Sequence, residues 1–342
     1  MHSYIIAMVI KMKIYSYKDK PIEVHGVPFF EKTGKLERLP ESVRKAVPSL
    51  EDLGRRCPGA RLCFRTNSPK IVLKMTLGTL NWDIGMSIYD CQAANVMIGE
   101  RQHARFAGLL HPENYETMVC QREFLKDSSM EDVTIWFPRN EVVADFTIAI
   151  EDDAQIEAPT PYKYPPMLFY GSSITEGGCC CRVTNVYSAI ISQHLDIDYY
   201  NLGFSAGAKG ELEIADYINT IPISIFVYDY DHNAPSAEHL RKTHEPFFKR
   251  IREKNPTLPI VIMTKPDFDY DPEAPERREV IFNTYQNAVD AGDTNVYFID
   301  GQTFFGNQDR HFCTCDCCHP NDLGFYRMAQ TLEPVIKGIL GV

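Results

Sequence analysis

The residues that could carry out chemistry include Asp316 and His319, which lie close together in CDCCHP near the end of the chain. Asp316 precedes His319 by three residues, Pro320 fixes the turn, and a helical pattern follows. One short loop can therefore supply a general base and the carboxylate that orients its imidazole. Such a base turns a serine hydroxyl into a nucleophile by removing its proton. The loop thus predicts nucleophilic catalysis by a serine elsewhere in the chain.

The candidate nucleophiles are Ser172 and Ser173, in the stretch LFYGSSITEGG at residues 168–178. An apolar strand stops at Gly171 and runs into these two hydroxyl side chains. Successive side chains in a strand-to-helix turn point to different sides, so only one of the two serines can face the histidine. The residues themselves favour neither serine.

Two further motifs could bind the oxyanion of a tetrahedral intermediate, which needs preorganised hydrogen-bond donors. NLGFSAG contains Gly203, and YDYDHNAP contains Asn233. The donors could be the backbone N–H groups of Ser173 and Gly203 and the side-chain amide of Asn233. Taken alone, each motif is better explained as an ordinary turn. Four motifs in the order Ser, Gly, Asn, His, each at a strand end, are hard to attribute to turns.

The elements that must position these motifs alternate between strands and helices after residue 159. Continuous apolar strands separated by amphipathic helices indicate a parallel sheet covered on both faces. Ligands of such folds bind beyond the carboxyl ends of the strands. The sequence therefore predicts an α/β domain with three layers, α/β/α, over residues 159–342. The expected strands are MLFYG, DYYNLGF, ISIFVYDY, PIVIMTKP and VYFIDG.

The first part of the chain has the pattern of an all-β domain. Five segments alternate apolar and polar residues at period two, which predicts strands with one buried face. This pattern is typical of a β-sandwich, here jelly-roll-like, over residues 1–158. A connector rich in acidic residues and proline, DDAQIEAPTPYKYPP, separates the two domains. The five segments are Arg61–Ser68, Lys70–Leu77, Met86–Cys91, Glu131–Pro138 and Ala144–Glu151.

Composition and charge exclude several classes of partner. The chain has 342 residues, 44% of them hydrophobic and 24% charged, as in a globular protein with real cores. Its formal net charge of −11 argues against nucleic acid or an anionic membrane surface as a partner. The short apolar run Tyr4–Ile10 precedes Lys11 and Lys13, the reverse of a signal peptide, so we expect a cytoplasmic protein. The sequence allows a homo-oligomer but does not indicate one.

The eleven cysteines are odd in number and clustered, which does not suggest a secreted disulfide framework. Reduced thiols in the cytoplasm fit better. A zinc site that includes His319 is the alternative. However, C-x-C-x-C-C-H is not a common structural zinc pattern, and zinc would take the same histidine from catalysis, so we expect no metal and no other cofactor. Because both clusters flank the candidate site, they can meet in space, where metal or oxidation would inactivate it. The clusters are Cys179–Cys181 and Cys313, Cys315, Cys317 and Cys318.

The four motifs YGSSIT, NLGFS, DHN and DCCHP together resemble the blocks of the GDSL/SGNH hydrolases, over about residues 165–342. The preceding β-rich part is similar to the jelly-roll domain of a subset that includes carbohydrate acetyl esterases and some acyltransferases. The resemblance implies that Ser173 is the nucleophile, His319 the base and Asp316 its partner. It also implies that Ser173, Gly203 and Asn233 form the oxyanion hole. Two positions depart from the family pattern: Ser172 replaces an aspartate, and Ala234 follows Asn233 where the family has aspartate.

The activity that this resemblance implies is ester hydrolysis through an acyl-Ser173 intermediate. We expect the acyl group to be small, namely acetyl, and the substrate to be a small-molecule or oligosaccharide ester. An acyltransferase would use the same residues, with a hydroxyl acceptor in place of water. A non-catalytic carbohydrate-binding protein is the third reading of the sequence.

Overall fold

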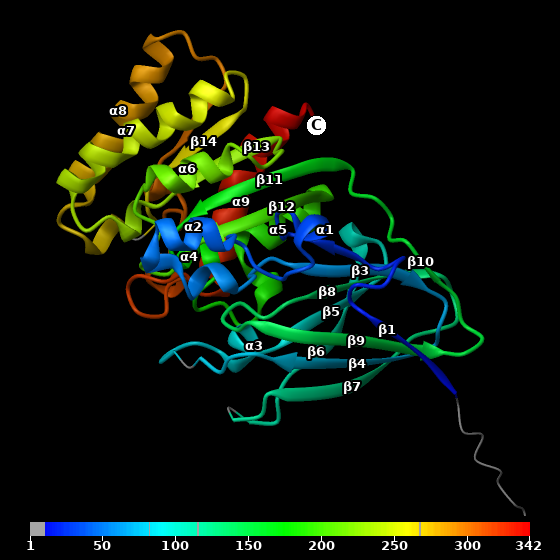
Figure 1. Cartoon of the computed structure of the whole chain (residues 1–342). Coiled ribbons are helices and arrows are strands. Elements are labelled where there is room, and N and C mark those ends of the chain that lie inside the picture. Colours follow the sequence, from blue (N-terminus) through cyan, green and yellow to red (C-terminus); the bar gives the residue numbers. More distant parts are fainter. Residues whose placement is uncertain (1–10, 82, 115, 267) are drawn as a thin grey trace, which may run out of the picture.

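The structure is a computed structural model that describes residues 11–342 except 82, 115 and 267. Its first part contains two antiparallel sheets, and its second part contains one parallel sheet (Figure 1). This confirms the predicted fold class. The apolar run Tyr4–Ile10 lies outside the described residues.

The two antiparallel sheets form a sandwich. The strands are β1 (Met12–Ser16), β2 (Glu23–His25), β3 (Arg61–Thr66), β4 (Lys70–Leu77), β5 (Ala94–Ile98), β6 (Arg105–Leu110), β7 (Val119–Leu125), β8 (Glu131–Trp136), β9 (Val143–Glu151) and β10 (Ile156–Glu157). One sheet has the order β1-β9-β4-β7, and the other has the order β10-β3-β8-β5-β6, with β2 paired to β3. Leu73 and Ile148 of the first sheet share one core with Leu62 and Ile135 of the second. Alternate side chains of each strand therefore fill the space between the sheets.

The predicted strand over Met86–Cys91 is wrong. Residues 88–91 form a short helix, α3 (Ile88–Cys91). The Ser87 hydroxyl caps this helix by accepting a hydrogen bond from the backbone N–H of Tyr89 at 3.2 Å. An alternation over six residues is too short to exclude a helical turn, and the local cap decides here.

The parallel sheet has the order β12-β11-β13-β14-β15. Its strands are β11 (Tyr164–Gly171), β12 (Ile197–Gly203), β13 (Ile225–Asp229), β14 (Ile260–Met263) and β15 (Val296–Ile299). The helices around it are α4 (Ser173–Glu176), α5 (Tyr187–Leu195), α6 (Leu212–Ile218), α7 (Ala237–Lys254), α8 (Ala274–Asp290) and α9 (Asp322–Leu340). Among the described residues, none of the helices combines the length and the apolar character that a membrane crossing needs.

Both faces of the parallel sheet are covered, which explains why its strands are mostly apolar. In β11, Leu168 and Tyr170 join a core with residues of α6, α7 and α8. Met167 and Phe169 of the same strand point to the opposite face and join a core with residues of α5 and α9. The predicted three layers, α/β/α, are confirmed.

The order of the strands explains where the four motifs meet. The chain passes from β11 to β12 on one side and then crosses to β13 on the other side of β11. The carboxyl ends of these three strands therefore border one crevice, the usual ligand site of open α/β sheets. Ser173 follows β11, Gly203 ends β12, and Asn233 follows β13.

The segment between β2 and β3 packs against both parts of the chain: Phe30 and Leu36 join the sandwich core, whereas its middle packs against the parallel sheet. It contains α1 (Phe30–Thr33), α2 (Glu41–Ala46) and the 3-10 turns η1 (Pro48–Leu50) and η2 (Leu53–Arg55). Leu39 and Leu50 are fully buried in the core on the α6 and α7 side of the sheet. Helix α2 lies against α6, as Figure 1 shows. The boundary between residues 158 and 159 stays a prediction, but the part of this earlier segment around Leu39 and Leu50 packs with the second part of the chain.

Candidate active site

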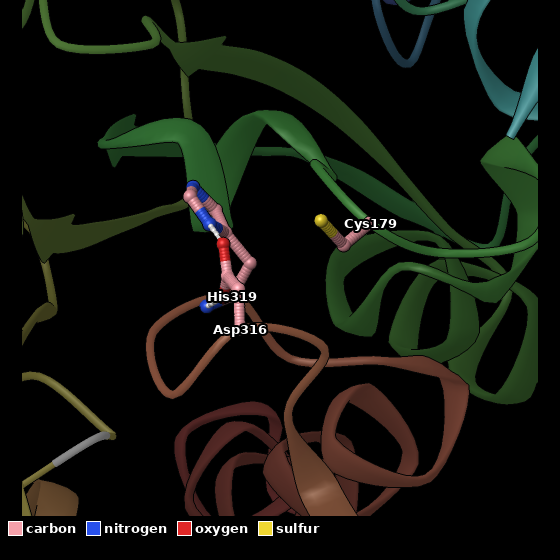
Figure 2. A group of neighbouring side chains, drawn as sticks. All are labelled: Cys179, Asp316 and His319. Atoms are coloured by element: carbon pink, nitrogen blue, oxygen red, sulfur yellow. Dashed lines mark hydrogen bonds and ion pairs between the residues drawn. The ribbon is translucent and has the colours of Figure 1, made fainter. Parts of the chain in front are cut away.

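Ser173, His319 and Asp316 come together at the carboxyl end of β11. The Ser173 Oγ lies 2.9 Å from the His319 Nε2. The His319 Nδ1 lies 2.7 Å from an Asp316 carboxylate oxygen, a contact that Figure 2 shows as a dashed line. When Nδ1 carries its proton toward the carboxylate, Nε2 is left as the acceptor for the serine proton. The geometry is that of a nucleophile, a base and an orienting carboxylate.

The structure separates the roles of the two adjacent serines. Ser172 is the N-cap of α4, and its buried hydroxyl accepts a hydrogen bond from the backbone N–H of Ile174 at 3.1 Å. Ser173 is the first residue of the helix, and its hydroxyl faces His319. Gly171 permits the sharp turn, because a Cβ there would lie 2.1 Å from the backbone oxygen of Asp229. Ser173 is therefore the serine that can react.

The loop before α9 holds the imidazole through the Asp316 carboxylate. One carboxylate oxygen accepts the backbone N–H groups of Cys318 at 3.1 Å and His319 at 2.7 Å. Burial alone would raise the pKa of Asp316, but these hydrogen bonds and the one from the imidazole lower it below its usual value. Asp316 is therefore ionised at neutral pH and keeps the imidazole in one orientation.

The Cys318 thiol interacts with the His319 imidazole and shifts its pKa. The pKa of His319 is raised to about 9, chiefly by a hydrogen bond to Cys318, with burial opposing and Asp316 adding to the rise. Burial would raise the pKa of Cys318, but hydrogen bonds to His232 and His319 outweigh it and lower the pKa to about 7. The Cys318 sulfur lies 3.8 Å from the His232 Nδ1. The thiol thus favours the protonated form of the imidazole.

The structure corrects the expected role of Gly203. Its backbone N–H already donates to the Asn201 side chain at 2.8 Å, so it is not an available oxyanion donor. A Cβ at Gly203 would lie 2.2 Å from the backbone nitrogen of Glu176, so glycine is needed there for β12 to approach α4. Gly203 therefore serves the packing of this turn, and its N–H is already used.

Ala206 is another candidate donor in this turn. It has a left-handed backbone, with φ of 54°, in the turn after β12, and it lines the same cleft as Ser173 and Asn233. None of the hydrogen bonds found among the described residues uses its N–H. Ser173 is the first helical residue, so its N–H has no acceptor within α4. The Asn233 amide donates one hydrogen to the Phe204 carbonyl at 2.8 Å and has a second to offer.

A buried ion pair that sequence reasoning missed positions this turn. The Arg38 guanidinium donates to the backbone carbonyls of Asn201, at 3.1 Å, and Gly203, and to the Glu176 carboxylate at 3.0 Å. The other Glu176 oxygen accepts the backbone N–H of Ser205 at 3.3 Å. Both charged side chains are completely buried. An arginine in an irregular segment, far from the motifs in sequence, carries no pattern that predicts such a role.

A second ion pair holds the Asn233 turn, the 3-10 helix η5 (Asp231–Asn233). The Arg277 Nε donates to an Asp231 carboxylate oxygen at 2.9 Å, and the same guanidinium donates to the Ala234 carbonyl at 2.9 Å. Asp231 also accepts the backbone N–H of Lys265 at 3.0 Å. The turn that carries Asn233 is therefore tied to α8 and to the end of β14.

Ser173 and His319 open into a cleft of about 710 Å³ between the two parts of the chain. The sandwich and the segment before it supply one wall, and the turns after β12 and β13 supply the other. A larger cavity of about 810 Å³ lies between α7 and α8, but it contains none of the motif residues. The first wall is lined by Leu53, Arg56, Asp83, Ile84, Met86 and Asn140. The second is lined by Ser205, Ala206, Lys209, His232, Asn233 and Pro235.

The two cysteine clusters meet beside the site, as their positions in the sequence allowed. All eleven cysteines are free thiols. The Cys315 thiol lies 3.7 Å from the backbone oxygen of Cys179. Cys179, Asp316 and His319 each offer one metal-binding atom, and these atoms lie within 4.8 Å of one another.

The comparisons with known proteins agree with this architecture. Residues 164–337 match the sequence profile of the GDSL-like lipase/acylhydrolase family, and residues 12–156 match the N-terminal region of SGNH-hydrolase-type esterases. No protein with a curated description matches the sequence.

Solved structures share the fold over nearly the whole chain. A protein from Bacteroides ovatus described as a GDSL-like lipase is 23% identical, with a TM-score of 0.86, and the match covers 97% of this chain and 98% of that one. A salicylyl-acyltransferase from a tetracycline biosynthetic pathway is 19% identical, with a TM-score of 0.79 and the same coverage. A family two carbohydrate esterase from Cellvibrio japonicus is 12% identical, with a TM-score of 0.66 and the same coverage. At these identities the likeness shows the fold.

Proposed function

The chain belongs to the GDSL-like lipase/acylhydrolase family, and from this premise we propose that it hydrolyses small acyl esters of a carbohydrate through an acyl-Ser173 intermediate. One observation carries the proposal: the Ser173 hydroxyl lies 2.9 Å from an imidazole that a carboxylate orients from its other side. This arrangement activates a serine for acyl transfer and has no use in a protein that merely binds sugars.

The proposed reaction proceeds in two halves. His319 removes the Ser173 proton through Nε2 while the oxygen attacks the acyl carbonyl, and Asp316 stabilises the imidazolium that forms. The N–H groups of Ser173 and Ala206 and the Asn233 amide receive the oxyanion, each such donor contributing about 3 kcal/mol to the transition state. The imidazolium then protonates the leaving alcohol. Water, activated by the same imidazole, releases the acyl group and regenerates the serine.

The cleft supports a polar alcohol as the leaving group. Its sandwich wall presents Arg56, Asp83 and Asn140, which are hydrogen-bonding side chains suited to sugar hydroxyls. Asn140 donates to the Asp83 carboxylate at 3.0 Å and accepts from Arg56, so the three are held in fixed positions. The carbohydrate esterase among the structures of like fold supports the same substrate class.

Acyl transfer to a hydroxyl acceptor is the second candidate, and the acyltransferase of like fold supports it. The two activities share every catalytic group and differ in whether water or an acceptor alcohol attacks the acyl-enzyme.

The proposal of hydrolysis is tested by incubating the protein with a chromogenic acetyl ester and with its butyryl and octanoyl counterparts, with and without added sugars.

We expect the acetyl ester to react roughly 10-fold or more faster than the octanoyl ester, with free acetate as the product even when sugar is present. Rapid quenching and mass spectrometry of peptides should find the acetyl group on Ser173. Acetylated sugar in place of acetate would establish the transferase instead. A protein that turns over the ester without ever carrying an acyl group on Ser173 would disprove the proposed mechanism.

The pH dependence of hydrolysis tests the coupling between Cys318 and His319. The base must be neutral to act, so with a His319 pKa raised to about 9, kcat/KM should fall as the pH drops below that value. The variant Cys318→Ala removes the hydrogen bond that contributes most to the rise, so the His319 pKa falls and activity persists to lower pH. For each unit by which the His319 pKa falls toward 7, kcat/KM measured at pH 7 should rise about tenfold.

The measurement is kcat/KM across pH 5 to about 10 for both proteins, since this profile reports the free enzyme. Cys317→Ala serves as the matched control, because Cys317 is an exposed thiol in the same loop. An acid limb at the same pH in all three proteins would contradict the coupling.

A further inference from the structure

Three side chains of the kinds that bind metal ions, one of them the base His319, lie close together on two separate loops. Cys179 follows α4, whereas Asp316 and His319 precede α9, and one ligand atom of each lies within 4.8 Å of the others. In Figure 2 the Cys179 sulfur lies on the side of its residue that faces the Asp316 and His319 pair. The Cys179 side chain is nearly buried, whereas the Asp316 side chain is half exposed.

The two loops are held together by close packing and by hydrogen bonds from Asp322. A Cβ at Gly178 would lie 3.6 Å from the His319 Cδ2, so the turn that carries Cys179 packs directly against the imidazole. Asp322, at the start of α9, accepts the backbone N–H of Cys181 at 2.8 Å and the Asn185 amide at 2.8 Å. The three side chains therefore need only small movements to share one ion.

The surroundings favour a thiophilic cation. The Met86 sulfur lies 3.5 Å from the Cys179 sulfur, and the Cys315 thiol donates to the Cys179 backbone carbonyl. Zinc accepts thiolate, imidazole and carboxylate ligands together, whereas magnesium and calcium prefer oxygen ligands alone. Tetrahedral zinc would bring its ligand atoms to about 3.5 Å from one another, so the widest separation would have to close by about 1 Å.

We propose that Cys179, Asp316 and His319 form a zinc site that overlaps the catalytic groups, so that bound Zn²⁺ reversibly inhibits the enzyme. The Cys179 thiol releases its proton as the sulfur–zinc bond forms, and water or Cys315 takes the remaining position. Whichever ring nitrogen binds zinc, the imidazole loses either its bond to Asp316 or the lone pair that accepts the Ser173 proton. The metal site rests on the ligand geometry, while the inhibition rests on the proposed function.

The test separates binding from catalysis by using full-length Ser173→Ala protein, reduced and freed of metal with a chelator. Titration with Zn²⁺ should give one ion bound per chain, and titration with Co²⁺ should give the absorption band of a cobalt–thiolate bond. Adding Cys179→Ala or Cys179→Ser should remove the band and weaken zinc binding by about 100-fold or more. Cys181→Ala, which removes an exposed thiol two residues away, should bind zinc as before.

Activity supplies the second readout. Zinc should inhibit the enzyme with native Ser173, excess chelator should restore activity, and Mg²⁺ should have no effect. Circular dichroism checks that the Cys179 variants are folded, and two different substitutions guard against an artefact of one. The proposal is overturned if zinc binds equally well without Cys179, if no cobalt–thiolate band forms, or if a chelator fails to restore activity. An esterase-inactive protein that still binds zinc through Cys179 would refute the proposed function but leave the metal site standing.

Discussion

Replacing Ser173 by alanine is expected to lower kcat/KM for an acetyl ester by about 10⁴-fold or more, because the variant lacks the atom that is acylated in the proposed mechanism. His319 remains in place, and the oxyanion donors are backbone N–H groups and the Asn233 amide, so residual activity should come from binding and oxyanion stabilisation alone. The thermal midpoint should change little, since within the described part of the chain the Ser173 hydroxyl has one hydrogen-bond partner, His319. Steady-state kinetics with the chromogenic acetyl ester and a thermal melt measure both effects.

The neighbouring Ser172→Ala variant is the matched control. It should lose stability and keep its activity, the opposite of what is expected for Ser173→Ala. It removes the hydroxyl that caps α4 by accepting the Ile174 N–H, so it should cost about 1 kcal/mol in the free energy of unfolding. Its kcat/KM should stay within about tenfold of the parent, since the serine that faces the imidazole is unchanged. A dead Ser172→Ala protein alongside an active Ser173→Ala protein would show that the nucleophile was wrongly identified.

Replacing Arg38 by methionine should cost about 3 to 5 kcal/mol in the free energy of unfolding, because it leaves buried polar groups without their partner. Arg38 is fully buried and donates to several backbone carbonyls, among them those of Leu53 at 2.8 Å and Arg56 at 2.8 Å, as well as to Glu176. Burial lowers the pKa of Arg38 to about 10, even though Glu176 raises it, so the guanidinium is still charged at neutral pH. Its loss leaves the Glu176 carboxylate with a longer contact to Arg139, at 3.6 Å.

The same substitution should lower kcat more than it raises KM. Glu176 links Arg38 to the Ser205 N–H, next to the Ala206 N–H that we assign to the oxyanion. Loosening this turn weakens an interaction made in the transition state rather than with the bound ester. Urea unfolding and kinetics at a temperature where the variant is folded give the two measurements.

Arg55→Met is the control for Arg38, because Arg55 lies in the same segment but is half exposed and pairs with Glu51 at the surface. Surface pairs of this kind contribute about 0 to 1 kcal/mol, so this variant should resemble the parent in stability and kinetics. Equal effects of the two substitutions would contradict the role given to Arg38. A loss of stability without any change in kcat would restrict Arg38 to a structural role.

The amino-acid sequence by itself determined the layers and the ingredients of the site. The strands of the second part are mostly apolar because both their faces are covered, and this pattern does not depend on which helix covers which face. Asp316 and His319 belong to one turn, so their hydrogen bond follows from a separation of three residues. The remaining motifs follow successive strands, and parallel strands bring their carboxyl ends to the same edge.

Tertiary structure alone decided everything that depends on the direction of a single bond or on residues far apart in the chain. Which serine faces the imidazole depends on the cap of α4, because the Ser172 hydroxyl turns inward to the Ile174 N–H and Ser173 contacts His319. The Gly203 N–H was found to donate to Asn201, so the proposed oxyanion donor is Ala206, since backbone N–H directions follow from local dihedral angles that residue types do not specify. Arg38 and Cys179 approach the site across more than a hundred residues of sequence, and only the packing of the chain gives them neighbours there.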